Sequence, residues 1–422
     1  MPGSPRSMSR IGAVVAILAV VTPSSMTAQQ TDRVPLDLAS DASVRPWVRY
    51  ACWPTRNAAT FNTLAVLASP PAPKEPRQLT GPVTGDPAIG KQLVADRSRG
   101  GSCLACHVMG PAGGADLPGN IGPDLSEIGN ANNDDEWLFN FVYDARVYVD
   151  DTPMPPFGSH VIFDDTEIGH VVAFLKTLKA PAPFKRDIDD PEKRPPPVEK
   201  RDNVDRAANP AMRAVDEKAP ALWKLAGPAG SACATCHAQP EKAFNRWAAS
   251  MPKWEPRLDK VLGVEEFVAR HAKATTGQAW PMETDKNIAL SLYLRYLANG
   301  TAIDVDVENA ASKASYERGR ELSLRKVGQL NFSCADCHLP GRGALKWMGG
   351  QWLPDMNGQL DHFPTWRAGQ QAIWDIRKRF QWCQVASWAN ELPPDAKEYG
   401  DLELYLTAQS NGLKLDVPGM RD

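Results

Sequence analysis

The sequence has neither an excess of basic residues nor a long apolar run. Its 422 residues carry a formal net charge of −3, whereas a nucleic-acid-binding protein needs a surplus of lysine and arginine. Its apolar stretch, Ile11–Val21, covers about 11 residues, well short of the roughly 20 that one bilayer crossing requires. We therefore expect no nucleic-acid partner and no membrane span in the mature chain.

The short apolar stretch has the surroundings of an export signal. Arg6 and Arg10 precede it, and small and polar residues follow it as far as Met26-Thr27-Ala28. A basic start, a short apolar segment and a small-residue cleavage site are typical of a secretory signal peptide. We predict a signal peptide over residues 1–28 and a periplasmic mature protein, with an uncleaved membrane anchor as the alternative.

Cysteine is scarce outside one repeated motif. Six of the eight cysteines belong to three copies of Cys-x-x-Cys-His. Two thiols at this spacing can form thioethers with the two vinyl groups of haem, and the adjacent histidine then supplies an iron ligand. A zinc or redox site is the alternative for one copy, but three copies in an exported chain favour haem. We predict three covalently bound haem c groups, attached through Cys103, Cys106, Cys233, Cys236, Cys334 and Cys337, with His107, His237 and His338 as axial ligands.

Two cysteines, Cys52 and Cys383, remain, and in an exported protein such a pair first suggests a disulfide. Cys383 follows Arg377, Lys378 and Arg379 on a predicted helix, with Arg379 one turn away on the same face. A cationic pocket would suit a sulfur oxyanion and lower the pKa of the thiol. The alternative is a solvated cationic helix face beside a structural thiol.

Proline-rich segments and a weak helical repeat indicate the domain organisation. The 37 prolines predict long irregular loops, and the charged, proline-rich segment from Ala180 to about Pro210 is predicted to be a semi-extended linker. A short helix precedes each haem motif and a longer helix closes each unit, predicted at 166–178, 286–297 and 398–406. Asp164 and Glu167 suit a capping box. We predict a mainly α protein with three class I cytochrome c-like domains and long irregular loops.

The first haem has a clear candidate for its second axial ligand. Met154 stands among prolines in Pro153–Phe157, just before the first closing helix. A thioether ligand there raises the reduction potential, whereas Met109 is too close to the proximal side to reach over. We also expect Gly122-Pro123 to supply a carbonyl that orients the His107 ring.

These motifs carry a resemblance to the cytochromes of bacterial sulfur oxidation. The first part of the chain resembles SoxX, a monohaem subunit, in Gly101–His107, Leu117–Pro123 and Met154–Gly158. From about Asn209 onwards the chain is similar to SoxA, a dihaem subunit. The matching segments are Ser231–His237, Gly328–Ser333, Phe363-Pro364, Arg379–Cys383 and Leu402–Leu406. A SoxX–SoxA fusion is predicted, with an N-terminal extension at 29–82, a SoxX-like domain at 83–180, a linker at 181–208 and SoxA-like domains at 209–308 and 309–422.

The resemblance implies an enzyme, L-cysteine S-thiosulfotransferase. It would couple thiosulfate to a cysteine of the carrier SoxYZ and pass electrons to a small soluble c-type cytochrome. The resemblance makes Cys383 the distal ligand of the third haem, found as a persulfide in the family, and Arg379 the matching arginine. Cys383 and Arg379 are thus the expected catalytic residues, with Arg379 binding thiosulfate. The alternatives are a tetrathionate-forming thiosulfate dehydrogenase and a non-enzymatic trihaem electron-transfer protein.

The chain departs from the family at the middle haem. SoxA proteins usually place a cysteine after the first SoxA haem as its distal ligand, but here the segment reads Phe267–His271. His271 is the expected substitute, with Met251 and Met282 as weaker alternatives. In the family this haem lies far from the others, so we hypothesise that its ligand could change without loss of turnover. Cys52 is interpreted as a spare thiol.

Overall fold

The computed structural model describes residues 3, 34–39, 41–43, 60–99, 102–110, 117–131, 133–197 and 206–421. Cys52 and, apart from residue 3, the predicted signal peptide lie outside the described residues. The chain divides into a short unit, 1–35, and a compact unit, 36–422, with which all that follows is concerned. In the part that the structure describes, no helix is long and apolar enough to cross a membrane. We use the predicted boundaries to name a first region (83–180), a middle region (209–308) and a last region (309–422).

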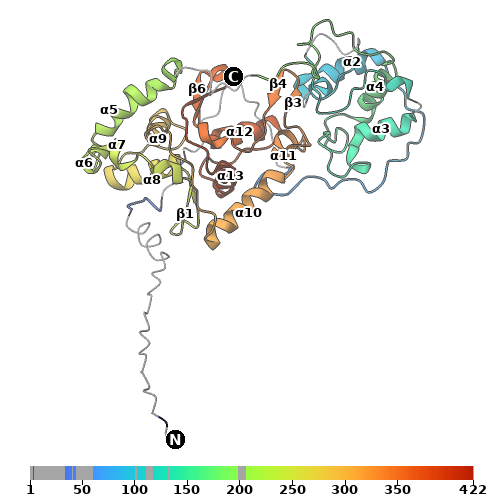
Figure 1. The fold of residues 1–422 in the computed structure, drawn as a ribbon. Helices are drawn as coiled ribbons and strands as arrows, with labels where there is room; N and C mark the ends of the chain where they lie inside the picture. The colour runs from blue at the N-terminus through green and yellow to red at the C-terminus, as the bar shows by residue number, and fades with distance from the viewer. Residues whose placement is uncertain are drawn as a thin grey trace. The chain divides into compact units, whose positions relative to one another are not determined.

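Three helices build the first region: α2 (Pro87–Ala95), α3 (Asp135–Asp144) and α4 (Asp165–Leu175) (Figure 1). The predicted capping box begins α4: the Asp164 carboxylate accepts from the backbone N–H of Glu167 at 2.8 Å, and the Glu167 carboxylate accepts from that of Asp164 at 3.0 Å. The first predicted closing helix is thereby confirmed. A Cβ at Gly90 of α2 would overlap the carbonyl of His170 on α4, so glycine permits this close crossing.

The last region repeats this helix crossing. Its helices are α10 (Ala310–Leu324), α11 (Cys334–His338), α12 (Ile376–Ala386) and α13 (Lys397–Ala408). A Cβ at Gly319 of α10 would overlap the carbonyl of Asp401 on α13, as at Gly90 in the first region. The predicted closing helix at 398–406 is confirmed by α13. Two regions of the chain thus share one way of packing their opening helix on their closing helix.

The middle region is a third, more divergent helical unit. It contains α5 (Ala219–Lys224), α6 (Cys233–Cys236), α7 (Pro240–Ala243), α8 (Val264–Thr276) and α9 (Asp285–Leu297), with a π-helix, η8 (Ala214–Lys218), before α5. The closing helix predicted at 286–297 is confirmed by α9. Further short 3₁₀ turns lie at η1 (Arg97–Arg99), η2 (Cys103–Ala105), η4 (Ile128–Asn130), η5 (Ala145–Val147), η7 (Arg206–Ala208), η9 (Trp247–Ser250), η10 (Leu360–His362) and η11 (Ala368–Gln370).

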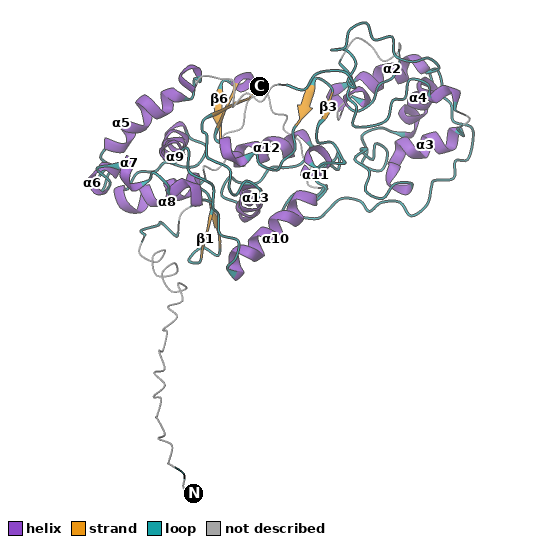
Figure 2. Ribbon diagram, in the orientation of Figure 1, coloured by secondary structure: helices purple, strands orange, loops and turns teal. Residues whose placement is uncertain are grey.

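Short strands supplement the helices without changing the mainly α character seen in Figure 2, so the predicted fold class is confirmed. Two antiparallel hairpins pair β1 (Lys253–Glu255) with β2 (Lys260–Leu262) and β3 (Lys346–Met348) with β4 (Gln351–Leu353). A third sheet places β5 (Thr365–Arg367) between antiparallel β6 (Ala372–Trp374) and parallel β7 (Gly419–Arg421).

The hairpin β3–β4 of the last region binds the first haem motif. The backbone N–H of Gly349, in the turn of the hairpin, donates to the carbonyl of Ala105 at 2.7 Å, and Ala105 lies between Cys103 and Cys106. Asn120 and Trp347 exchange two further bonds: Asn120 N–H donates to the Trp347 carbonyl at 3.0 Å, and Trp347 N–H donates to Asn120 Oδ1 at 2.8 Å. The hairpin therefore fixes the first region against the last.

Arg194, from the predicted linker, reinforces this junction. Its side chain donates to the carbonyl of Gly349 at 2.8 Å and to that of Pro118 at 3.3 Å, and its guanidinium lies 4.8 Å from the centre of the Trp347 ring. Arg194 is only 4% exposed. Proline and charge content predicted a semi-extended linker and gave no sign of this anchor, because its partners lie far away in the sequence.

Replacing Arg194 with methionine should loosen the junction. The substitution leaves the Gly349 and Pro118 carbonyls without their donor, at a cost of about 1–3 kcal/mol for a buried unsatisfied group. We expect faster hydrogen exchange in the peptide that contains β3–β4, measured by mass spectrometry. Arg186→Met is the control, because Arg186 is exposed and forms a local ion pair with Asp189. Unchanged exchange in Arg194→Met would contradict the anchoring role.

Candidate haem sites

One cavity joins the haem motifs of the first and last regions. Its volume is about 1430 Å³, larger than the roughly 300–1,000 Å³ of a pocket for a drug-sized ligand. The predicted haem-site and catalytic residues among those that line it are Cys103, Cys106, His107 and Met154 from the first region, and Cys334, Cys337, His338, Arg379 and Cys383 from the last. Predicted ligand sets far apart in the sequence thus face a common space.

The first ligand set has a preoriented imidazole. His107 Nδ1 lies 2.8 Å from the carbonyl oxygen of Pro123, which can only accept, so Nδ1 carries the proton and Nε2 is left for iron. This confirms the expected carbonyl. A Cβ at Gly122 would overlap the His107 ring. Burial lowers the pKa of His107, which keeps the imidazole neutral as ligation requires.

The last ligand set repeats this arrangement. His338 Nδ1 lies 2.8 Å from the carbonyl oxygen of Pro354, at the same sequence separation of 16 residues as between His107 and Pro123. Burial lowers the pKa of His338 to about 4, with the Arg379 cation as a smaller cause. We did not foresee Pro354, although a proline at this equal spacing was a usable signal in the sequence. In both sets the thiols, the oriented imidazole and the apolar walls fit a covalently bound haem.

Cys383 and Arg379 lie on the α12 side of the cavity. The N-terminus of α12 is capped by Asp375, whose Oδ1 accepts from the Lys378 N–H at 2.7 Å. Burial raises the pKa of the Cys334 and Cys337 thiols, and the neighbouring Cys383 raises it further. The Arg379 guanidinium lies 4.6 Å from the centre of the Trp382 ring, and its buried Nη1 has no hydrogen-bond partner among the described residues.

The sequence predicts that Arg377, Lys378 and Arg379 of α12 form a cationic pocket beside Cys383. This prediction is wrong for Arg377 and Lys378, because neither residue lines the cavity. Arg377 is 1% exposed and binds Glu266 Oε2 at 3.0 Å and Glu403 Oε2 at 2.8 Å. Lys378 binds Glu283 at 3.2 Å. The alternative of a solvated face is equally wrong for these two residues. Successive helix positions point about 100° apart, so only Arg379, one turn before Cys383, shares its face.

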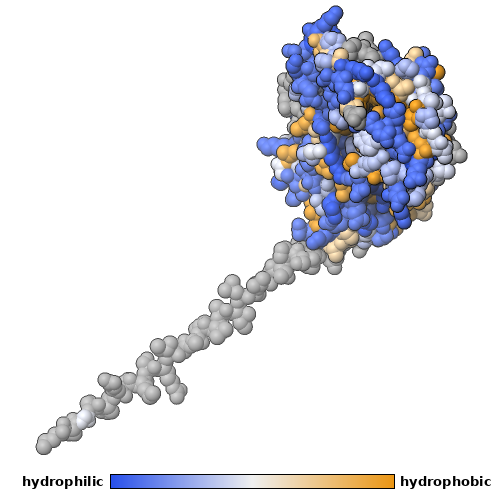
Figure 3. All heavy atoms as spheres, turned by 90° about the vertical axis from the view of Figure 1, so that its right-hand side faces the viewer, coloured by the Kyte–Doolittle hydropathy of each residue, from blue (hydrophilic) through white to orange (hydrophobic). Residues whose placement is uncertain are grey.

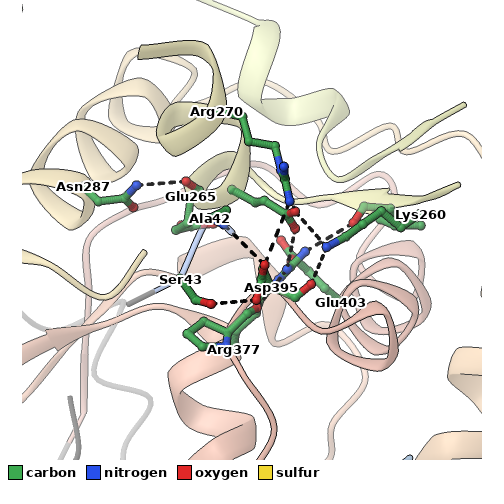
Figure 4. A network of polar contacts seen from close by, with 12 residues as sticks. Ala42, Ser43, Lys260, Glu265, Arg270, Asn287, Arg377, Asp395 and Glu403 are labelled. Atoms are coloured by element: carbon green, nitrogen blue, oxygen red, sulfur yellow. Dashed lines mark hydrogen bonds and ion pairs between the residues drawn. The ribbon is translucent and has the colours of Figure 1, made fainter. Parts of the chain in front are cut away.

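Arg377 belongs to a buried ionic network between the middle and last regions (Figure 4). Glu266 of α8 also binds Lys260 at 2.8 Å and Arg270 at 2.9 Å, and Glu403 of α13 binds Arg295 at 3.3 Å. Nearby, the hydroxyl of Ser43 donates to Asp395 at 2.8 Å. The network connects α8 with α12 and α13, and it therefore fixes the helix that presents Cys383.

Arg377 and Arg379, two positions apart, should respond differently to substitution. Arg377→Met removes one cation from each of two buried carboxylates, Glu266 and Glu403. Loss of a partner from a buried ion pair should lower the free energy of unfolding by about 3–5 kcal/mol. Arg379→Met should change it by less than about 1 kcal/mol, because Arg379 Nη1 has no described partner to lose. Denaturant unfolding of both variants measures the difference. A larger loss for Arg379→Met would contradict this assignment.

The middle ligand set lies outside the shared cavity, since neither His237 nor His271 lines it. The two ring centres are 6.2 Å apart. Two imidazoles that bind one metal from opposite sides should have ring centres about 6.2 Å apart. Each side contributes a metal–nitrogen bond of about 2.0 Å and about 1.1 Å from the nitrogen to the ring centre. Stacking on Phe267, with 5.3 Å between ring centres, restrains His271.

The two methionines that are the alternative ligands lie in hydrophobic clusters. Met251 is part of a large buried cluster, and Met282 packs with Ala42 and Ala269. The spacing favours His271 over both methionines.

The EPR spectrum tests the ligands of the middle site. We expect one haem with a thiolate-type low-spin signal, from the Cys383 site, and one with a bis-imidazole signal. Because thioether ligation raises the potential, His271→Met should remove the bis-imidazole signal and raise the potential of that haem alone. Thiolate-type signals from two haems in the unmodified chain would exclude His271 as the ligand.

Comparison with known proteins gives the class. The family described as cytochrome c matches residues 87–179, and the family described as SoxA/TsdA, cytochrome c domain, matches residues 218–303. Cys-x-x-Cys-His is the attachment motif of c-type haem, and both families overlap copies of it in this chain. The chain therefore contains cytochrome c domains, which imply covalently bound haem c.

Relatives narrow the class further. The L-cysteine S-thiosulfotransferase subunit SoxA of Pseudaminobacter salicylatoxidans is 29% identical over 223 residues, 52% of this chain and 75% of the relative. The same subunit of Chlorobaculum thiosulfatiphilum is 34% identical over 170 residues, 40% of this chain and 59% of the relative. The match to the crystal structure of SoxXA from P. pantotrophus covers 52% of this chain and 81% of the matched chain, at 27% identity and with a TM-score of 0.46. The family matches and the SoxA relatives together support a SoxXA-type cytochrome.

Proposed function

We propose that the chain is a periplasmic trihaem L-cysteine S-thiosulfotransferase, which joins thiosulfate to a cysteine of the carrier SoxYZ. The observation that carries the proposal is that Cys383 and Arg379 line the same cavity as Cys334, Cys337 and His338. Thiosulfate-oxidising chemistry is supported by the relatives named L-cysteine S-thiosulfotransferase subunit SoxA. In this proposal the His107/Met154 and His338/Cys383 sites act together, and the His237/His271 site takes no part in turnover.

Arg379 is proposed to bind the thiosulfate dianion. Its buried Nη1 has no hydrogen-bond partner among the described residues, so a donor is available on the cavity wall. Guanidinium groups suit oxyanions because their N–H donors form charge-assisted hydrogen bonds in a fixed fork. Contact with the Trp382 ring restrains the side chain. Cys383 lies one turn further along α12, where thiosulfate held by Arg379 would be presented to its sulfur.

The coupling forms one bond and releases two electrons. The thiol of the carrier cysteine loses its proton, its sulfur bonds to the terminal sulfur of thiosulfate, and the product is a cysteine S-thiosulfonate. When bound, each haem supplies a one-electron acceptor, so the reaction requires two acceptors or two passes. The shared cavity favours the first alternative. A small soluble c-type cytochrome then takes the electrons from the His107/Met154 site.

Substitution of the two proposed catalytic residues tests this function. Cys383→Ala should abolish carrier-dependent oxidation of thiosulfate, because it removes the proposed sulfur site. Arg379→Gln should lower kcat/KM by about 10- to 100-fold, the equivalent of a hydrogen bond to a charged group worth about 1.5–3 kcal/mol. The control is Arg320→Gln, because Arg320 lies on the surface of α10 and pairs with Glu317. Steady-state assays should be run with and without SoxYZ.

The same assays separate the alternatives. Tetrathionate formation without SoxYZ would identify a thiosulfate dehydrogenase instead. Full electron-transfer activity in Cys383→Ala, with only a shifted potential, would identify a non-enzymatic cytochrome. Mass spectrometry of the peptide containing Cys383 should show added sulfur after exposure to thiosulfate, and an unmodified thiol combined with carrier-independent haem reduction would overturn the proposal.

A further inference from the structure

Three aromatic rings connect the first ligand set with the protein surface. Trp137 and Phe141 of α3 line the shared cavity together with Met154. The ring centres of Trp137 and Phe141 are 5.0 Å apart, and the Phe141 ring stacks on Tyr148 at 5.6 Å with 11° between the planes. Trp137 and Tyr148 are each 36% exposed. We call these three residues the aromatic patch. It contacts the cavity on one side and solvent on the other.

The aromatic patch has an acidic rim. Residues 131–152 include six carboxylates, at Asp134, Asp135, Glu136, Asp144, Asp150 and Asp151, and a single basic residue, Arg146. Arg146 forms an ion pair with Asp144, at 2.6 Å. Burial and the carboxylates of Glu136 and Asp134 raise the pKa of Tyr148, so both carboxylates act on the patch itself.

Part of this acidic charge is uncompensated. Asp135 pairs with Lys176, and Asp151 pairs with Arg342 and Lys326. Asp134, Glu136 and Asp150 form no ion pair with any cation in the described part of the chain. Next to Asp150, Val149 is 49% exposed and extends the apolar surface. The side of the molecule that bears α2, α3 and α4 is otherwise mostly hydrophilic (Figure 3).

This combination is typical of a transient protein interface. Aromatic residues are enriched in interface cores and polar residues at their rims, and electron-transfer encounters use small contact areas, below about 1,200 Å². A rim of one charge sign attracts a partner of the opposite sign and speeds their encounter. The aromatic patch lies beside Met154, so its rings connect the first ligand set with the surface. A partner bound there could therefore accept an electron from the first site.

We propose that the aromatic patch is the docking surface for a basic c-type cytochrome, which takes one electron from the first haem site at each encounter. The inference rests on the proposed function only for the physiological source of the electrons. No bond forms or breaks: the first site is oxidised by one electron and the acceptor haem is reduced by one.

Stopped-flow kinetics with an artificial donor tests the docking surface directly. The holoprotein is reduced with ascorbate, freed of excess reductant and mixed with a commercial basic mitochondrial cytochrome c as the probe. The second-order rate constant should fall as salt rises. In the triple variant Asp134→Asn, Glu136→Gln, Asp150→Asn it should be about tenfold lower at low salt, with a weaker salt dependence. Asparagine keeps the N-cap that Asp134 provides to α3.

Matched variants separate docking from general effects. The control triple Asp216→Asn, Glu217→Gln, Asp285→Asn makes the same charge change on exposed residues of the middle region, and it should react like the unmodified chain. Tyr148→Ser, at a patch residue outside the cavity lining, should lower the rate at every salt concentration without changing the salt dependence or the spectrum of the first site. Equal effects of the two triples, or no effect of either patch variant, would overturn the proposal. Because ascorbate supplies the electrons, a failure of thiosulfate turnover leaves this result interpretable.

Discussion

The backbone hydrogen bond from Gly349 to the carbonyl of Ala105 is the contact on which the arrangement of the two proposed redox sites depends. Ala105 lies inside the first haem motif, so this bond positions the segment that bears Cys103, Cys106 and His107. Five residues after Gly349, the carbonyl of Pro354 accepts from His338. The hairpin therefore contacts the first motif, and the residue directly after it orients the imidazole of the last. This double attachment places both motifs on one cavity.

Three copies of the same motif acquire different chemical surroundings. At the first site the thioether of Met154 lines the cavity beside the aromatic patch, whose rings extend to the surface. The last site has the Cys383 thiol and the Arg379 guanidinium, whose Nη1 has no hydrogen-bond partner in the described part of the chain. The middle site has two imidazoles at a separation that suits one metal and lies away from the cavity. The motif specifies attachment, and the helices and loops around it supply the division of roles.

Local features of the molecule could be predicted from the sequence, and long-range ones could not. The closing helices, the capping box at Asp164 and the Pro123 carbonyl depend on residues close together in the chain, and all are confirmed. The role of Arg377 depends on Glu266, 111 positions away, and the role of Arg194 on Gly349, 155 positions away. The three cations in a row before Cys383 therefore predicted one cationic pocket. Tertiary packing instead buries Arg377 and Lys378 against carboxylates, and of the three only Arg379 lines the cavity.

A single-turnover experiment tests most directly whether the His107 and His338 sites work as a pair within one chain. The fully oxidised holoprotein is mixed with thiosulfate and SoxYZ in the absence of an acceptor cytochrome. Reduced haem is counted by absorbance, and coupled carrier cysteine is counted by mass spectrometry. Pairing predicts two reduced haems per coupled cysteine, formed at a rate that does not depend on protein concentration. One reduced haem in each chain, at a rate that rises with protein concentration, would contradict it.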